Sequence, residues 1–155
     1  MEPKVVIILI GAPGSGKTTW GKFYAESRCI VRLCPDEFRA KLGTSEDDQS
    51  VSAEAFGLTR AGMENVLSQN KSVMIDATNM SKKRRKQFLD IAHKYNAKTM
   101  AIIFEADKKT LVDRNINRGK AGGSNVPEEI IDRMLENYQR PDETEFDIIQ
   151  YISKL

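Results

Sequence analysis

Gly11-Ala12-Pro13-Gly14-Ser15-Gly16-Lys17-Thr18 directly follows six apolar residues, Val5 to Ile10, near the start of the chain. Such an unbroken run, rich in β-branched residues, is typical of a buried strand inside a parallel sheet. The residues from Lys17 to Glu26 can form a helix. The order of strand, glycine-rich loop and helix is the context in which the pattern G-x-x-x-x-G-K-[ST] forms a phosphate-binding loop.

The chemistry of this loop predicts that the chain binds a nucleoside triphosphate. Its glycines let successive backbone N–H groups point at phosphate oxygens, and the helix that follows adds a partial positive charge. Lys17 can reach the β- and γ-phosphates, and the Thr18 hydroxyl can ligate Mg²⁺. We therefore predict ATP and Mg²⁺ as cofactors. The predicted nucleotide-binding residues of the loop are Gly11, Ala12, Pro13, Gly14, Ser15, Gly16, Lys17, Thr18 and Thr19.

Length and composition limit the possible classes of protein. A chain of 155 residues with 40% hydrophobic and 30% charged residues predicts one globular domain, residues 1–155. No apolar run approaches the roughly 20 residues of a membrane span. The N-terminus is not a signal peptide, and Cys29 and Cys34 are too few for a disulfide framework. These features favour a cytoplasmic protein without a membrane partner.

Apolar runs alternate with helical patterns along the rest of the chain. Further strands are predicted near residues 29–33, 72–76, 99–104 and 146–151. We predict an α/β fold in which a parallel five-stranded sheet is flanked by helices, as in adenylate-kinase-like P-loop proteins. Ligands of such sheets bind beyond the carboxyl ends of the strands.

The segments between these strands predict helices with recognisable start signals. We expect Asp36 to cap a short helix ending at Leu42, Ser81 to cap one running to about Tyr95, and Asp107 to cap one ending near Asn117. A longer helix is predicted over residues 52–70, and a last one from Pro127 to about residue 139. The glycine-rich residues 118–126 are expected to form a flexible lid.

Asp36 and Arg39 follow the second predicted strand and share one helix face. Near the γ-phosphate, a carboxylate can accept the proton of a substrate hydroxyl. An arginine beside it can hold a substrate phosphate through two parallel hydrogen bonds. The alternative is that Asp36 only caps the helix and that Arg39 is solvated. Both roles are compatible, since capping would also fix the carboxylate.

Asp76 ends the third predicted strand, where an acid often holds a Mg²⁺-bound water in phosphate-loop proteins. The alternative is a polar strand end with no metal role. Arg114 and Arg118 lie four residues apart at the end of a predicted helix. Basic residues are favoured there by the helix dipole, but lid arginines can also neutralise charge on a transferring phosphate.

Charge is unevenly distributed along the chain. Residues 80–120 hold 12 basic and 4 acidic residues, a balance of +8, although the whole chain carries only +2. Lys82-Lys83-Arg84-Arg85-Lys86 opens a predicted helix, where five cations oppose the helix dipole. Such a run is usually a solvated face, but a bound polyanion would offset the repulsion. Contact with nucleic acid is therefore one of two open interpretations.

With these residues identified, the chain resembles the kinase domain of phage-type 5′-hydroxyl polynucleotide kinases, from the first strand to about Tyr138. The resemblance rests on Gly11–Trp20, Pro35-Asp36-Glu37-Phe38-Arg39 and Val112–Gly119. It implies that Asp36 is the general base on a 5′-hydroxyl and that Arg39 holds the neighbouring phosphate of the acceptor. It also implies that Arg118 contacts donor phosphates.

The sequence departs from the phage enzymes in three ways. The segment expected to form the lid is longer and richer in glycine. The phage enzymes place an acid directly before Thr-Asn, whereas here Ala77 separates Asp76 from Thr78 and Asn79. Thr78 and Asn79 are the substrate-binding residues that the resemblance implies at this position. The phage enzymes also carry a C-terminal phosphatase domain, which this sequence does not contain.

The resulting prediction is an ATP-dependent kinase that phosphorylates the 5′-hydroxyl end of RNA or DNA. The predicted catalytic residues are Lys17, Asp36 and Arg118, the other donor-phosphate arginine is Arg114, and the metal ligands are Thr18 and Asp76. One alternative is a kinase for a small-molecule or tRNA-linked hydroxyl, because such kinases share these motifs. The other is a nucleotide-dependent switch or ATPase. No base-reading motif decides between ATP and GTP.

Overall fold

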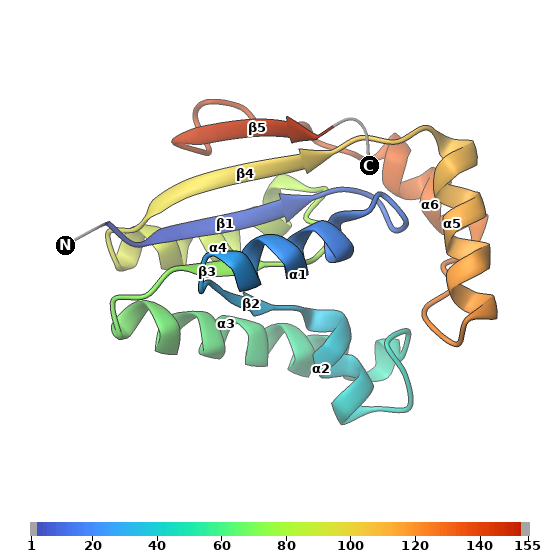
Figure 1. The fold of residues 1–155 in the computed structure, drawn as a ribbon, viewed down its shortest axis with the longest axis horizontal. Helices are drawn as coiled ribbons and strands as arrows, with labels where there is room; N and C mark the ends of the chain where they lie inside the picture. The colour runs from blue at the N-terminus through green and yellow to red at the C-terminus, as the bar shows by residue number, and fades with distance from the viewer. Residues whose placement is uncertain (1–2, 153–155) are drawn as a thin grey trace.

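The computed structural model, which describes residues 3–152, contains a five-stranded parallel sheet with the strand order β2-β3-β1-β4-β5 (Figure 1). The strands are β1 (Val5–Ile10), β2 (Val31–Leu33), β3 (Val73–Ile75), β4 (Lys98–Phe104) and β5 (Ile148–Ile152). The helices are α1 (Lys17–Ser27), α2 (Pro35–Leu42), α3 (Ser52–Ser68), α4 (Lys82–Lys94), α5 (Lys108–Lys120) and α6 (Glu128–Glu136), with a 3₁₀ turn at Gln49–Val51. The predicted fold class is confirmed.

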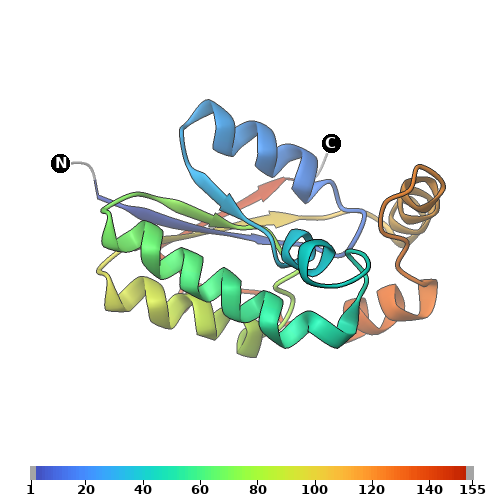
Figure 2. The ribbon, with the colours of Figure 1, turned by 90° about the horizontal axis from the view of Figure 1, so that it is seen from below.

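Helices cover the two faces of the sheet unequally. Figure 2 shows α3 and α4 side by side beneath the sheet, whereas α1 lies on the opposite face. Helices α5 and α6 stand apart from both layers, beyond the end of the sheet where β1 and β4 terminate. In the part of the chain that is described, no helix is long and apolar enough to span a membrane.

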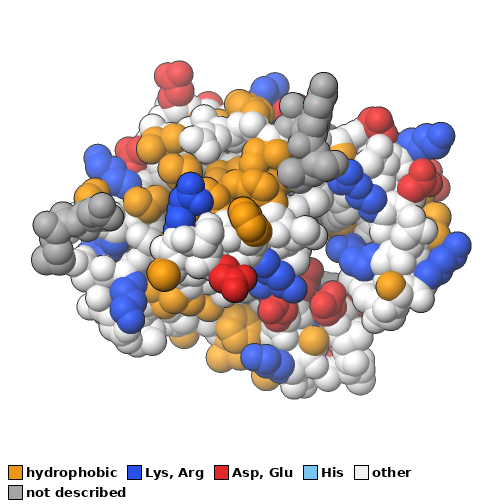
Figure 3. Space-filling model, viewed as in Figure 1, with side chains coloured by type: hydrophobic (Ala, Val, Ile, Leu, Met, Phe, Trp, Pro, Cys, Tyr) orange, Lys and Arg blue, Asp and Glu red, His pale blue; other side chains and the backbone are white. Residues whose placement is uncertain are grey.

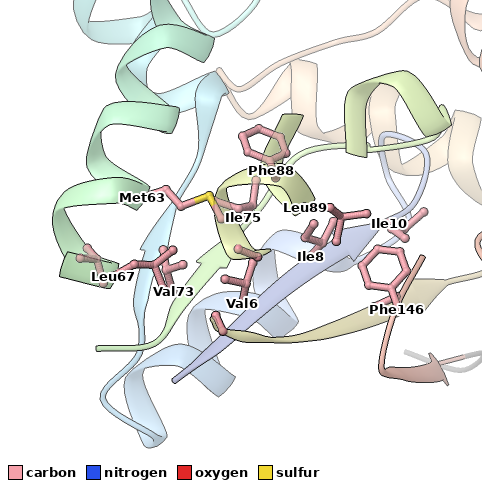
Figure 4. Packing of buried hydrophobic residues seen from close by; sticks show 14 of the residues in the cluster. Val6, Ile8, Ile10, Met63, Leu67, Val73, Ile75, Phe88, Leu89 and Phe146 are labelled. Carbon is pink, nitrogen blue, oxygen red and sulfur yellow. The ribbon is translucent and has the colours of Figure 1, made fainter. Parts of the chain in front are cut away.

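The larger core lies between the sheet and the pair α3–α4 (Figure 4). Strand β1 is central, and its successive residues point in turn to the two helical layers. Val6, Ile8 and Ile10 face α3 and α4, and Ile7 and Leu9 face α1. Met63 of α3 and Phe88 of α4 fill the space beneath β1 and β3. A third, smaller cluster joins α5 and α6 to the phosphate-loop segment through Ala12, Leu111 and Ile131.

Several element boundaries differ from the sequence predictions by a few residues, and two of them affect residues singled out above. Helix α2 begins at Pro35 after an N-cap at Cys34, so the prediction that Asp36 is the capping residue is wrong. Proline is favoured at the first helical position because its fixed φ suits the helix. Asp36 remains in the first turn, where the helix dipole favours a carboxylate. Helix α5 extends to Lys120, so the first three residues of the expected lid are helical.

The other two predicted caps are confirmed. The Ser81 hydroxyl accepts a hydrogen bond from the Arg84 N–H, and the Asp107 carboxylate accepts one from the Thr110 N–H. These caps fix the starts of α4 and α5, which are the helices that follow β3 and β4. Both helices therefore begin at the edge of the sheet where the strands end.

The basic run at the start of α4 is not one uniform face. The side chain of Arg85 is fully buried, and it forms two hydrogen bonds of 2.9 and 3.0 Å with the Glu145 carboxylate. A third bond, from the Arg85 guanidinium to the Asn79 carbonyl, ties α4 to the segment after β3. Arg85 thus belongs to the packing of the fold. The neighbouring Lys82, Lys83, Arg84 and Lys86 are exposed.

The two cysteines lie in different environments. Cys29 is exposed, and Cys34 is buried between β2 and α2. Burial, with a contribution from the Asp76 carboxylate, raises the pKa of the Cys34 thiol to about 12. Cys34 therefore stays protonated at neutral pH, and a protonated thiol is a poor nucleophile.

We expect Glu145→Ala to destabilise the protein by about 3–5 kcal/mol, because it leaves the Arg85 charge buried without its partner. Urea unfolding at neutral pH measures this change. Lys86→Ala, on the helix that carries Arg85, is the control: its ion pair with Asp90 is exposed, so removing it should cost less than about 0.5 kcal/mol. Equal effects of the two substitutions would contradict the structural role of Arg85.

Iodoacetamide treatment of the folded protein at pH 8 should alkylate Cys29 and leave Cys34 unmodified. Peptide mass spectrometry with and without denaturant measures the two sites separately. Cys34 should react only after unfolding, when its pKa returns to the usual value near 8.5. Rapid labelling of Cys34 in the native protein would show that the junction of β2 and α2 is open.

Candidate active site

A cleft of about 1000 Å³ lies where the carboxyl ends of the strands meet α1, α2 and α5. Most of its lining comes from the phosphate loop with the first turns of α1, the end of β2 with the start of α2, and the inner side of α5. Glu46 and Gly123, from the loops after α2 and α5, complete it. Figure 3 shows the hollow in this region between the body of the molecule and the α5 side, with acidic and basic side chains around it. The predicted residues Lys17, Thr18, Asp36, Arg114 and Arg118 all line the cleft.

The phosphate loop adopts a conformation that requires glycine at two positions. Gly14 and Gly16 have φ values of 86° and 93°, in the left-handed region that other residues avoid. At Gly14 a Cβ would also lie only 2.7 Å from the amide nitrogen of Asn115. Gly16 caps α1, so the N-terminus of this helix points into the cleft. This arrangement suits an anion.

The Lys17 side chain is buried at the base of the loop. Burial lowers the pKa of its ammonium group, the Asp76 carboxylate raises it, and the nearby Arg118 guanidinium lowers it further. Lys17, Asp76 and Arg118 are therefore close enough to interact, although they come from three separate segments. Because desolvation is the largest effect, a bound polyanion would stabilise the charged form of Lys17.

Asp76 is also buried, and the Arg32 guanidinium holds it. The Arg32 Nε and terminal nitrogen both donate to one carboxylate oxygen of Asp76, at 2.9 and 2.6 Å. Another Arg32 nitrogen pairs with Glu37 at 2.5 Å. Arg32 lines the cleft beside the predicted residues. The sequence analysis did not identify it, although an arginine in a short strand is an unusual feature.

The oxygen donors of this site fit Mg²⁺. Thr18 supplies a hydroxyl in the cleft and Asp76 a carboxylate beneath it, and Mg²⁺ prefers oxygen ligands. Residues 3–152 contain no group of three or more His, Cys, Asp or Glu side chains that could hold a metal ion. A sparse donor set is expected where Mg²⁺ keeps several waters and takes its other ligands from phosphates.

Asp36 and Arg39 form an ion pair in α2. About half of the Asp36 side chain is exposed, whereas Arg39 is mostly covered. The Arg39 Nε donates to the Glu46 carbonyl at 2.8 Å, so the helix is tied to the loop that follows it. Asp36 lines the cleft and Arg39 lies behind it. The predicted pair is therefore together in space, on the wall opposite Arg114 and Arg118.

Helix α5 is held against the phosphate loop by Asn115, which the sequence analysis missed. Its buried amide donates to the Pro13 carbonyl at 2.8 Å, and its oxygen accepts from Arg118 at 2.6 Å. Arg114 donates to the Gly14 carbonyl at 3.1 Å. A signal was available, because Asn115 lies four residues after the buried Leu111 and so on the inward face of α5.

Not all predicted residues reach the cleft. The Asn79 side chain is buried and donates to the Leu9 carbonyl at 2.8 Å, and the Thr78 carbonyl accepts from the Gly11 N–H at 3.0 Å. Both residues support the phosphate loop from below, and their role in substrate binding stays a prediction. Gly11, Ala12 and Ser15 line a separate small cavity of about 170 Å³ behind the loop.

Comparison with known proteins places this geometry in context. The chain is 26% identical over 144 residues to the L-seryl-tRNA(Sec) kinase of Methanococcus maripaludis. This alignment covers 88% of this chain and 53% of that protein. It is 26% identical over 117 residues to the bifunctional polynucleotide phosphatase/kinase of Schizosaccharomyces pombe, covering 76% of this chain and 25% of that protein. The chain thus spans about half, or less, of the length of these relatives.

A solved structure of the Pnkp1/Rnl/Hen1 RNA repair complex is also similar, with a TM-score of 0.77 and 26% identity over 88% of this chain and 44% of that one. The model of a family described as AAA domain matches residues 6–141, which include every residue that lines the cleft. The chain therefore belongs to this AAA domain family, and its nucleotide-binding loop stands in a P-loop kinase-like fold.

Proposed function

We propose that this protein is an ATP-dependent kinase that transfers the γ-phosphate to the 5′-hydroxyl end of RNA or DNA. The observation that carries the proposal is that two sets of residues lie on opposite sides of one cleft. The phosphate loop, with Arg114 and Arg118, forms a cationic donor side, and Asp36 with Arg39 forms an acceptor side. A nucleotide-dependent switch would not need the second set.

In the proposed reaction, Lys17 and the loop N–H groups hold the β- and γ-phosphates. Asp36 accepts the proton of the acceptor hydroxyl as its oxygen bonds to the γ-phosphorus, while the bond to the β-phosphate oxygen breaks and ADP leaves. Arg114 and Arg118 neutralise the charge on the phosphoryl group during transfer. Such an arginine contributes about 10³–10⁵ in rate in related reactions.

Thr18 and Asp76 would hold Mg²⁺ in this proposal, and the ion would supply charge neutralisation between the phosphates. Arg32 fixes the Asp76 carboxylate through two bonds, so the acid is oriented before nucleotide binds. This role is positioning, because Arg32 acts through Asp76.

A nucleic-acid acceptor is supported by a second arginine near Arg39. Burial lowers the pKa of Arg39, and the Arg84 guanidinium lowers it further. The two guanidinium groups are therefore near one another. Arg84 stacks on the Phe56 ring at 4.2 Å and remains exposed. An acceptor with more than one phosphate would bind both arginines, whereas a small hydroxyl compound would need neither.

A kinase for a tRNA-linked hydroxyl is the second candidate. It is favoured by the similarity to an L-seryl-tRNA(Sec) kinase over 88% of the chain. The same donor side and the same Asp36 would serve it, since the chemistry of the hydroxyl is unchanged. Acceptor identity is what separates the two candidates.

The decisive experiment incubates the protein with γ-labelled ATP and Mg²⁺ and a panel of acceptors: 5′-hydroxyl RNA, 5′-hydroxyl DNA, nucleosides and tRNA. Label on the 5′ ends of oligonucleotides supports the proposal. Label on aminoacylated tRNA alone supports the second candidate, and release of labelled phosphate without any labelled acceptor supports an ATPase.

In the same assay, Asp36→Asn should lower transfer by roughly 10²–10⁴-fold, the usual contribution of a general base. ATP binding, measured by equilibrium titration, should stay near the wild-type value because Asp36 lies on the acceptor side. Glu54→Gln, at an exposed acid of α3 that does not line the cleft, is the control for charge. Wild-type turnover by Asp36→Asn would contradict the assignment of the base.

Arg84→Glu should raise KM for a 5′-hydroxyl oligonucleotide by about tenfold or more. The substitution removes a phosphate contact and puts a negative charge where the acceptor's phosphates would bind. KM for ATP should be unchanged. Lys86→Glu makes the same change of charge on the same helix, at a side chain paired with Asp90, and should have a much smaller effect. Similar KM values for both variants would show that α4 does not contact the acceptor.

A further inference from the structure

The loop after α2 and the loop after α5 are joined across the mouth of the cleft. The Ser124 hydroxyl donates to one carboxylate oxygen of Asp47, and the Asn125 N–H donates to the other at 3.4 Å. These residues are more than 75 positions apart in the sequence. Asp47 itself is exposed, whereas Ser124 is buried. The contact is therefore a specific bridge between the acceptor wall and the expected lid.

On the lid side, the bridge continues to the donor phosphates. The Ser124 carbonyl accepts from Arg118 Nε at 2.8 Å. Arg118 in turn donates to Asn115, whose amide donates to the Pro13 carbonyl of the phosphate loop. The same residue that bonds Asp47 thus holds the guanidinium that faces Lys17.

On the acceptor side, Asp47 is next to Glu46, whose carbonyl accepts from Arg39. The loop is rigid around it, because the two Asp48 oxygens accept from the Thr44 and Ser50 N–H groups at 3.0 and 3.1 Å. Gly43 permits this turn, since a Cβ there would lie 2.1 Å from Asp48. Asp47 is consequently presented to the lid from a fixed support.

We propose that Asp47 is a positioning residue that latches the lid and couples the acceptor-side Arg39 to the donor-side Arg118. This inference rests on the proposed kinase function, whose site it completes. With the latch closed, Arg118 is held over the γ-phosphate and the lid shields the phosphate from water. With the latch open, Arg118 loses its support, and water competes with the acceptor hydroxyl for the γ-phosphorus.

The latch can be tested by removing either partner. Asp47→Ala and Ser124→Ala should each lower the turnover of transfer by about tenfold or more. The double variant should be no worse than Asp47→Ala, because that substitution already removes both bonds to the lid. The ratio of ADP formed to acceptor phosphorylated should rise in all three. Asp47→Asn keeps an oxygen for the Ser124 hydroxyl and should restore part of the coupling. Asp90→Ala, an exposed acid on α4, is the control.

Hydrogen exchange of the lid amides, residues 121–126, gives a readout that needs no acceptor. Asp47→Ala should speed their exchange by about tenfold, while exchange in β1 and β4 stays unchanged. If lid exchange becomes faster in Asp47→Ala but the wild-type protein labels no acceptor, the proposed function is overturned and the latch contact is not. Unchanged lid exchange together with an unchanged ADP-to-product ratio, in an active kinase, would overturn the latch. Additive losses in the double variant would do the same.

Discussion

One buried carboxylate, Asp76, interacts with two cations, Lys17 and Arg32, and this imbalance organises the site. A third cation, Arg118, lies close enough to Lys17 to lower the pKa of its ammonium group further. Burying an ammonium group is costly unless a negative group compensates it. Asp76 compensates only in part, since burial still lowers the pKa of Lys17. The site is therefore electrostatically incomplete until a polyanion binds, which is the property that a triphosphate-binding loop needs.

The sequence was sufficient for features that depend on local chemistry. The order of elements followed from the apolar run before Gly11 and from the caps at Ser81 and Asp107, because strand burial and helix capping depend on neighbouring residues. The placement of Lys17 and Asp36 in one cleft followed from the parallel sheet, whose strand ends meet at one edge. Residues at the ends of parallel strands lie together because of the order in which strands and helices are connected.

Features that depend on long-range pairing could not be predicted. Arg85 looked like one of five equivalent cations, and only its partner Glu145, 60 residues away, makes it part of the packing. Arg32 with Asp76 and Asp47 with Ser124 are likewise pairs between distant segments. The Asp36 cap failed for a local reason, because Pro35 competes for the helix start. Charge patterns thus locate a basic region without distinguishing structural from functional cations.

The arrangement of Arg39 gives the proposed reaction an order. Arg39 is bonded to the Asp36 carboxylate and to the Glu46 carbonyl. An acceptor phosphate would compete with Asp36 for the Arg39 guanidinium, because both are anions that accept its hydrogen bonds. Binding of the acceptor would thereby free the Asp36 carboxylate to accept the proton of the hydroxyl. Acceptor binding and activation of the base are then one event, and water, which carries no phosphate, does not produce it.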